Sequence, residues 1–256
     1  MKILITGGTG MVGSAFKSIQ TKHELVLVGS ADYDLRWAND CKSMIMDNQP
    51  DAIIHLAAKV GGVKGNTDYI ADFFYDNIMI NTNLLNVAKD QKVKRVVSLL
   101  STCVYPNDVT YPLTEDQIHN GEPHQSNFGY AYAKRMLDVH SRALRHQYGC
   151  NYVTAIPNNM YGPNDSYDLL NGHVIPAIIR KIWEAKLLDR EPTFWGDGSS
   201  LREFSYAPDI AKTLLWMVEN YNQSIPLNIG GTGESSILDI VNKVKKIIGY
   251  KRSINW

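Results

Sequence analysis

The sequence has few cysteines, no excess of charge of either sign and no long apolar run. Its 256 residues contain three cysteines, Cys41, Cys103 and Cys150, an odd number without metal-ligand spacing. This predicts a reducing, cytoplasmic compartment and no metal site. Lysine plus arginine and aspartate plus glutamate both number 26, so we expect neither nucleic acid nor a membrane surface as a partner. No apolar run has the length of a membrane span, and a strand pattern that starts at Lys2 leaves no room for a signal peptide.

What the sequence does contain is a regular alternation of short apolar runs and longer amphipathic stretches. The apolar runs are predicted to be strands buried on both faces and lie at residues 3–5, 25–28, 52–56, 95–100 and 152–156. The stretches of helical length lie at roughly 11–20, 36–48, 68–90 and 127–147. Strand and helix repeated in this way predict an α/β fold, a Rossmann-type doubly wound parallel sheet with helices on both faces.

The pattern changes after Ile156, and the change predicts a second, smaller lobe that holds the substrate. The signals are, in chain order, breaks at Pro157, Gly162-Pro163 and Asn171-Gly172, a helix near His173, a glycine-rich turn at 195–199 and a strand at 202–206. Residues from 208 to about 230 are predicted to form a helix and a strand that return to the main domain. A last helix covers 237–248, and a further strand begins near Ser253.

These signals divide the chain into two predicted domains. We expect the Rossmann domain at 1–156 and 207–231, and the substrate lobe at 157–206 and 232–256, with the lobe shortened at its C-terminal end.

A glycine-rich loop joins the first predicted strand to the first helix. Gly7, Gly10 and Gly13 have the spacing that gives a tight turn, a close approach of backbone to a pyrophosphate and close packing of helix on strand. The N–H groups that open the helix would bind the phosphates. A glycine triplet alone could be an ordinary tight turn, but this position predicts a dinucleotide site. The loop residues assigned to the cofactor are Gly7, Gly8, Thr9, Gly10, Met11, Val12 and Gly13.

The end of the second strand favours NADP(H) over NAD. NAD-binding domains of this kind place an acid there to bond the ribose 2′-hydroxyl, and that acid would repel a 2′-phosphate. Here the position holds Gly29-Ser30, and Asp32 and Asp34 come slightly later. No arginine is evident to bind the phosphate. We expect Ser30 and Asp34 at the cofactor, with Asp34 near the adenine edge.

A serine, a tyrosine and a lysine have the arrangement of a carbonyl-reduction site. Tyr130 and Lys134 lie one turn apart on one helix face. A lysine ammonium there is expected to lower the pKa of the phenol and to hold the nicotinamide ribose. Ser101, just past the strand at 95–100, would hydrogen-bond the same carbonyl oxygen. A tyrosine and a lysine at this spacing also occur by chance. The pair predicts a reduction site here because a phosphate-binding loop precedes it in the chain.

Several longer motifs extend this pattern along the chain. They lie at residues 7–13, 56–62, 100–106, 126–136, 161–165, 172–176 and 195–198. From residue 3 to about residue 248 the sequence resembles the GDP-L-fucose synthase family, extended short-chain dehydrogenases/reductases that epimerise and reduce GDP-4-keto-6-deoxy-mannose. The glycine loop and the Tyr/Lys pair are shared by the whole superfamily. The segment 59–62 and the motifs around Cys103 and His173 are far more specific.

The resemblance implies an NADPH-dependent 3,5-epimerisation and 4-reduction that gives GDP-L-fucose. The family uses a cysteine and a histidine to move protons at the carbons beside the keto group, and the matching residues here are Cys103 and His173. A thiol and an imidazole suit this because both titrate near neutrality. By themselves, Cys103 could be a small buried hydrophobe, and His173 could simply cap a helix.

The resemblance also implies further contacts. Residues on the nicotinamide side are Leu99, Leu100, Thr102, Pro157, Asn158, Asn159, Met160, Lys134 and His173, and those at the sugar nucleotide are Lys181, Trp195 and Arg202. Asn77 matches an asparagine that supports the lysine through water, although Asn77, Asn81, Asn83 and Asn86 could instead be a solvated helix face. Helices at 68–90 and 127–147 form the family's homodimer bundle, so we expect a homodimer.

Two other functions stay open. A related enzyme could reduce or epimerise a different nucleotide-linked keto-sugar. A non-catalytic NADP-binding protein is the third reading, which the complete set of Ser101, Tyr130 and Lys134 disfavours.

Overall fold

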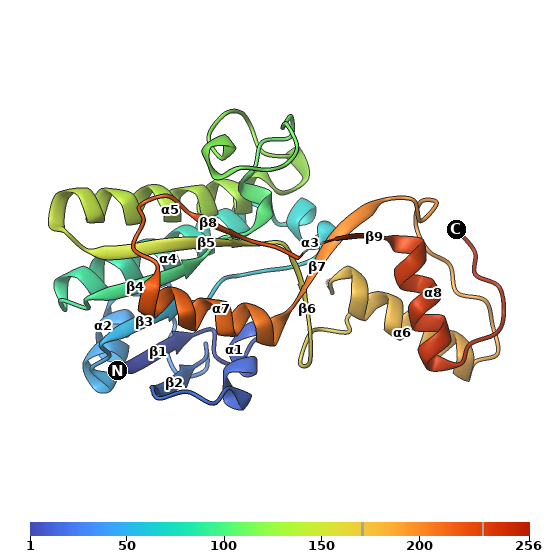
Figure 1. Cartoon of the computed structure of the whole chain (residues 1–256), viewed down its shortest axis with the longest axis horizontal. Coiled ribbons are helices and arrows are strands. Elements are labelled where there is room, and N and C mark those ends of the chain that lie inside the picture. The colour runs from blue at the N-terminus through green and yellow to red at the C-terminus, as the bar shows by residue number, and fades with distance from the viewer. Residues whose placement is uncertain (170–171, 232) are drawn as a thin grey trace.

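The computed structural model describes residues 1–169, 172–231 and 233–256. Figure 1 shows a larger body, in which a sheet lies between helices, and a smaller group of elements at one end. Asn171, one of the predicted break positions, and Thr232, where the second segment of the predicted lobe begins, lie outside the described residues.

Six parallel strands form the main sheet, in the order β2-β1-β3-β4-β5-β8. Their bounds are β1 Lys2–Thr6, β2 Glu24–Val28, β3 Ala52–His55, β4 Arg95–Leu99, β5 Asn151–Pro157 and β8 Leu227–Ile229. Ile3 and Ile5 pack into the core on one side of the sheet and Leu4 into the core on the other, because successive strand residues face opposite sides. A parallel sheet buried on both faces confirms the predicted fold class.

Two layers of helices cover the sheet. α2 Ala38–Asn48, α4 Ile70–Asp90 and α5 Phe128–Tyr148 supply the core on one face, and α1 Met11–Ala15 and α7 Ala207–Asn220 supply the core on the other. The helices expected at 36–48, 68–90 and 127–147 are confirmed to within two residues at each end.

The helix expected at 11–20 is wrong in length. α1 ends at Ala15, and a short 3-10 helix, η1 Phe16–Ser18, follows it. The hydroxyls of Ser14 and Ser18 donate to carbonyl oxygens three residues earlier in the chain. Such bonds compete with the regular pattern of an α-helix.

Shorter helices lie in the connections after β3 and β4. They are α3 Val63–Asp68, η2 Thr102–Val104, η3 Glu115–Gln117 and η4 Gln125–Asn127. Of these, η2 follows directly on β4 and places residues 101–104 at the carboxyl end of the sheet.

A second sheet of three strands and a pair of helices form the smaller part of the molecule. β6 Asn159–Tyr161 pairs in parallel with β7 Leu201–Tyr206, which pairs antiparallel with β9 Glu234–Ser236. α6 Val174–Leu187 and α8 Ile237–Ile248 share a small apolar core, on the right of Figure 1. Its buried members are Ile178, Ile182, Ala185, Phe194, Val241, Val244 and Tyr250. The helices expected near His173 and at 237–248 are thereby confirmed.

The last residues of the sequence lie against this smaller part. Asn255 forms an isolated parallel bridge with Thr193, and its backbone bonds Pro192 and Phe194. The strand expected near Ser253 is thus a single bridge. The division into two domains stays a prediction. None of the helices within the described ranges is long and apolar enough to cross a membrane.

Candidate active site

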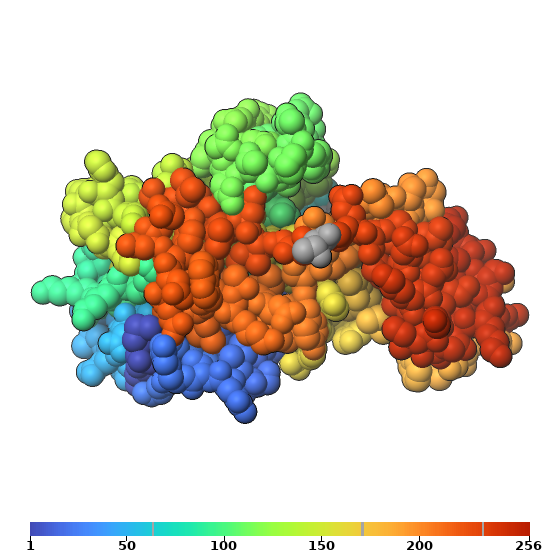
Figure 2. Space-filling model, in the orientation of Figure 1, coloured from blue at the N-terminus to red at the C-terminus, as the bar shows by residue number. Residues whose placement is uncertain are grey.

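A cavity of about 1220 Å³ lies where the carboxyl ends of the parallel strands face the smaller part of the molecule. Its walls include Thr6 at the end of β1, Leu99 at the end of β4 and Ile178 of α6. Figure 2 shows the α6–α8 region, in orange and red, as a separate bulge beside the main body. Ligands of open parallel sheets bind at the carboxyl ends of the strands, where the strand order reverses. Here that point lies between β1 and β3.

Backbone contacts fix the glycine loop at one end of the cavity. Gly7 has a φ of +69°, and a Cβ on it would lie 2.8 Å from the amide nitrogen of Ala57. A Cβ on Gly13 would lie 2.2 Å from the carbonyl oxygen of Gly7, so α1 packs directly on the loop. Only glycine fits either position. The resulting cradle has room for a pyrophosphate beside the N–H groups that open α1.

Nearly all of the predicted cofactor residues line this cavity. They are Gly7, Thr9, Gly10, Met11, Val12, Gly13, Ser30, Asp34, Leu99, Leu100, Thr102, Lys134, Pro157, Asn158, Asn159, Met160 and His173. Gly8 is not among the lining residues in the described part of the chain. Its amide donates to the carbonyl oxygen of Val28 at 2.8 Å, so it attaches the loop to β2.

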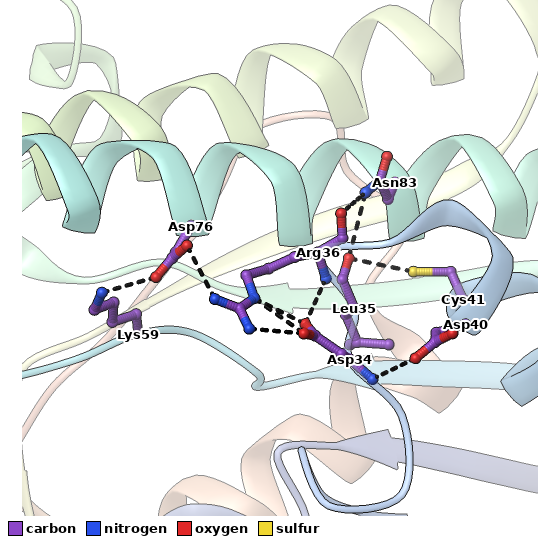
Figure 3. Close-up of polar contacts among 8 residues, drawn as sticks. All are labelled: Asp34, Leu35, Arg36, Asp40, Cys41, Lys59, Asp76 and Asn83. Atoms are coloured by element: carbon purple, nitrogen blue, oxygen red, sulfur yellow. Dashed lines mark hydrogen bonds and ion pairs between the residues drawn. The ribbon is translucent and has the colours of Figure 1, made fainter.

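An ion-pair network spans the cavity wall beyond β2 (Figure 3). The Asp34 carboxylate accepts two short bonds from the Arg36 guanidinium, from Nε at 2.9 Å and from Nη2 at 2.7 Å. Arg36 Nη1 lies 3.5 Å from Asp76 on α4, and Asp76 in turn binds Lys59 Nζ at 2.8 Å. The guanidinium lowers the pKa of Asp34 below its usual value, and the carboxylates raise the pKa of Arg36. Arg36 is therefore a cation on the cavity wall after β2, where the sequence analysis found no arginine to bind a 2′-phosphate.

Asn77 holds the loop after β3 and does not contact Lys134. Its side-chain oxygen accepts the amide of Lys59 at 3.0 Å, and its side-chain nitrogen donates to the carbonyls of Lys59 and Phe73 at 3.0 and 2.7 Å. Asn77 and Asn81 are 0% and 2% exposed, so a solvated face is excluded for both. Asn81 binds His55 and donates to the carbonyl oxygen of Ala133, the residue before Lys134.

Four predicted catalytic residues of the Rossmann part share one wall of the cavity. Ser101 precedes η2, and its hydroxyl accepts the amide of Cys103 at 3.5 Å. On α5, Lys134 lies with Nζ 5.7 Å from the centre of the Tyr130 ring and donates to the carbonyl oxygen of Leu99 at 2.8 Å. All four side chains line the cavity. Cys103 is partly buried in this wall.

Burial controls the ionisation of this wall. It lowers the pKa of Lys134 to about 8 and raises the pKa of Cys103 to about 11. Burial, and after it the charge of Cys103, raises the pKa of Tyr130 above its usual value. This direction is the opposite of our sequence-based expectation, because burial of the phenol disfavours its charged form. Tyr130 and Cys103 therefore both keep their protons at neutral pH.

His173 stands on the other wall, at the N-terminus of α6. It occupies the N-cap position, but its side chain caps no backbone N–H, so the interpretation as a simple helix cap is wrong. Its Nδ1 lies 3.1 Å from a carboxylate oxygen of Asp165. The hydrogen bond to Asp165 raises the pKa of His173, against the effect of burial. His173, Cys103 and Tyr130 thus face the same cavity from different parts of the chain.

The three predicted sugar-nucleotide residues line the far end of the cavity. Trp195 is 84% exposed. Lys181 Nζ lies 5.7 Å from the Trp195 ring and donates to the carbonyl oxygen of Thr193 at 2.9 Å. Arg202, at the start of β7, bonds only the adjacent carbonyl oxygen of Leu201 among the described residues. This end presents cations and aromatic faces, which suit a diphosphate and a base.

Comparison with known proteins agrees with this geometry. Residues 3–230 match the model of the NAD dependent epimerase/dehydratase family. A GDP-L-fucose synthase of Dictyostelium discoideum is 41% identical over an alignment of 256 positions, which covers 97% of this chain and 80% of that protein. The chain belongs to this family, in its GDP-L-fucose synthase group.

Two further proteins similar to this chain widen the comparison. A GDP-L-colitose synthase of Yersinia pseudotuberculosis is 37% identical over 98% of this chain and 83% of that protein. The crystal structure of a GDP-L-fucose synthetase from Naegleria fowleri bound to NADP is 38% identical, with a TM-score of 0.93 over 99% of this chain and 79% of that chain.

Sequence reasoning missed several residues on the cavity walls of this epimerase/dehydratase. Arg36, Lys59 and Trp256 line the cavity, and Asp76 does so from α4. Arg36 follows Asp34 by only two residues, but no linear signal shows that it turns toward the cavity. Trp256 also lacks such a signal, and only the structure shows that a Cβ on Gly198 would lie 2.6 Å from the Trp256 ring. That glycine leaves room for the indole.

Proposed function

We propose that this protein catalyses the NADPH-dependent 3,5-epimerisation and 4-reduction of GDP-4-keto-6-deoxy-D-mannose to GDP-L-fucose. One observation carries the proposal: a thiol, an imidazole and a phenol, from Cys103, His173 and Tyr130, line a single cavity next to a dinucleotide-type glycine loop. A simple reductase needs the phenol but has no use for the other two groups.

The residues at the cofactor end fit NADP(H). The loop at Gly7 and Gly13 provides a cradle that any side chain would fill. Ser30 replaces an acid at the end of β2, and Arg36 adds a cation to this part of the wall. NADPH, when bound, supplies the hydride. Lys134, whose Nζ donates to the carbonyl oxygen of Leu99, is proposed to bind the nicotinamide ribose.

The epimerisation requires proton transfer on both faces of the sugar ring. The 4-keto group acidifies the hydrogens at C3 and C5, and removal of either gives an enolate. Inversion follows when the proton returns to the opposite face. We propose that the Cys103 thiolate, a minor form at neutral pH because burial raises the pKa of the thiol, accepts the proton from C3 or C5 on one face. The His173 imidazolium on α6 then returns a proton to the opposite face, while Ser101 and Tyr130 hydrogen-bond the oxygen at C4.

The reduction needs a proton donor at the same oxygen. Because burial raises the pKa of Tyr130, its phenol stays protonated at neutral pH and can donate to O4 as C4 is reduced. Lys181 and Arg202 are proposed to bind the diphosphate, and Trp195 the base.

The deciding experiment follows solvent deuterium into the sugar. Incubation with the GDP-linked keto-sugar in D₂O should place deuterium at C3 and C5 of the product. Cys103→Ser and His173→Gln should each reduce this incorporation by about a hundredfold or more. Cys150→Ser, a free cysteine outside the cavity, is the matched control. Full incorporation in both cavity variants refutes the epimerase assignment.

A related keto-sugar substrate is the second candidate, because the colitose synthase that resembles this chain acts within the same group of enzymes. NADPH consumption with GDP-, UDP- and dTDP-linked keto-deoxy-sugars separates the two. A non-catalytic NADP-binding role would give no consumption with any of them.

We also propose a homodimer formed by α4 and α5. Phe74 and Tyr75 on α4, and Met136 and Val139 on α5, leave 42%, 59%, 40% and 39% of their surfaces exposed. Light scattering with Met136→Asp tests this, and a mass unchanged from that of the unaltered protein would contradict it. We further propose a cytoplasmic location, which the three free cysteines support. We also propose the domain boundaries given above, which the return of β8 to the main sheet supports.

A further inference from the structure

A buried carboxylate lies behind the proposed catalytic histidine. Asp165 ends the 161–165 motif between β6 and α6, and its side chain is 6% exposed. One oxygen, Oδ1, accepts the amide of Ser166 at 2.8 Å and faces His173 Nδ1 at 3.1 Å. The other oxygen, Oδ2, is buried without a hydrogen-bond partner in the ranges that the structure describes. A carboxylate buried with so few partners is unfavourable for folding, which points to a role beyond stability.

The contact with Asp165 determines which nitrogen of His173 carries the proton. An ionised carboxylate only accepts hydrogen bonds, so Nδ1 must be the protonated nitrogen. Nε2 makes no hydrogen bond to any described residue and is left for a ligand in the cavity. A histidine held through one nitrogen in this way has a fixed ring orientation and a fixed tautomer.

We propose that Asp165 is a positioning residue for proton transfer: it holds Nδ1 of His173 and thereby directs Nε2 at the sugar ring as the proton donor. The proposal rests on the function proposed above for His173. The carboxylate also favours the imidazolium form, since its hydrogen bond raises the pKa of His173. The opposing residue, Cys103, has no such carboxylate beside it among the described residues, and it accepts the sugar proton as the thiolate, which burial makes the minor form.

Other charged groups near the site do not replace Asp165. The titratable side chains that line this part of the cavity are Cys103, Tyr130, Lys134 and Lys181, and none of them has a hydrogen bond to His173 in the described structure. Lys134 binds the carbonyl of Leu99 and Lys181 that of Thr193. The polarisation of the imidazole therefore comes from Asp165.

A purely structural role for Asp165 is the competing explanation, because the same contact fastens the segment before α6. Arg180 provides a second attachment of this segment through the carbonyl oxygen of Tyr167, at 2.9 Å. The test must therefore report on the imidazole itself and on folding separately.

The first measurement uses ¹⁵N-histidine NMR of the unaltered protein, with His173→Gln to assign the signal. The neutral ring should be the Nδ1–H tautomer, and Asp165→Asn should move the titration of His173 to lower pH. Asp209→Asn, an exposed carboxylate on α7 that pairs with Lys212, should leave it unchanged. An Nε2–H tautomer in the unaltered protein, or the same titration in Asp165→Asn, would overturn the proposal. This readout needs no substrate.

The second measurement follows deuterium entry at C3 and C5 against pH. Asp165→Asn should slow exchange by about tenfold to a hundredfold at pH 7.5 and shift the limb of the profile that belongs to His173 to lower pH, while NADPH binding stays the same. An unchanged profile contradicts the positioning role. If the unaltered protein exchanges neither proton, the proposed function fails, but the NMR result still decides whether Asp165 controls His173.

Discussion

The two walls of the cavity hold their side chains by different means. The Rossmann wall, formed by the residues after β1 to β5 and by α5, is fixed by close packing: Lys134 is 2% exposed, and Gly7 and Gly13 lie in direct backbone contact. The lobe wall, formed by residues 172–202, is open. On it Trp195 is 84% exposed, and the side chain of His173 is 46% exposed.

This difference separates two tasks. Groups on the Rossmann wall cannot move without disturbing the main core, so they suit a cofactor that is the same in every cycle. Groups on the lobe wall depend on a few polar contacts, such as those of His173 with Asp165 and of Lys181 with Thr193. We expect substitutions in the glycine loop of the first wall to affect folding and cofactor together, and those on the second wall to affect mainly the substrate.

Gly13→Ala should have the largest effect of the changes that test this contrast. The added methyl would lie 2.2 Å from the carbonyl oxygen of Gly7, so the loop must shift. We expect a loss of about 3 kcal/mol in the free energy of unfolding and a fall in NADPH affinity of about a hundredfold, measured by urea unfolding and by fluorescence titration.

Gly149→Ala is the matched control, because Gly149 has a φ of +69° but no atom within 4 Å of its Cβ position. This substitution should lower the free energy of unfolding by about 1 kcal/mol, because alanine disfavours the left-handed backbone conformation. The affinity for NADPH should be retained. Equal effects of the two substitutions on NADPH binding would break the proposed contrast.

The Rossmann wall was the more predictable of the two. Apolar runs and the glycine spacing gave the strands, the fold class and the position of the loop, because these depend on local periodicity and backbone geometry. Even for this wall, some predictions made from the sequence were wrong. The amide of Gly8 bonds β2, and the pKa of Tyr130 moves up and not down. Each depends on burial or on a contact between distant segments.

The site residues of the lobe wall were predicted from family motifs and not from local periodicity or backbone geometry. Nothing in the local sequence says that His173 and Asp165 meet, or that Trp256 lies over Gly198. The turn of Arg36 toward Asp76 on α4 is equally invisible, because it joins residues forty positions apart in the chain. Such contacts follow only from the packing of whole elements.

Trp195→Ala should have an intermediate effect, confined to substrate. Because the indole is 84% exposed, its removal should leave the melting temperature unchanged. We expect KM for the GDP-sugar to rise about tenfold, which corresponds to about 1.4 kcal/mol of lost contact, with NADPH affinity retained. Steady-state kinetics measure this. Trp216→Ala, at a half-exposed tryptophan on α7 outside the cavity, serves as control, and an equal rise in KM there would remove Trp195 from the substrate site.

Ser236→Ala should have the smallest effect and tests whether the lobe wall is stabilised separately. The Ser236 hydroxyl and the Asp239 carboxylate form a capping box at the start of α8, and removal of the hydroxyl should cost about 1 kcal/mol. Since α8 packs with α6 and not with the main sheet, hydrogen exchange should quicken in these two helices, while the amides of β1 and β4 and the affinity for NADPH stay as they are. Ser224→Ala, at an exposed serine before β8, should change neither. Faster exchange in β1 or β4 of the Ser236 variant would show that the two walls unfold as one unit, and the separation of cofactor and substrate effects argued above would then need another origin.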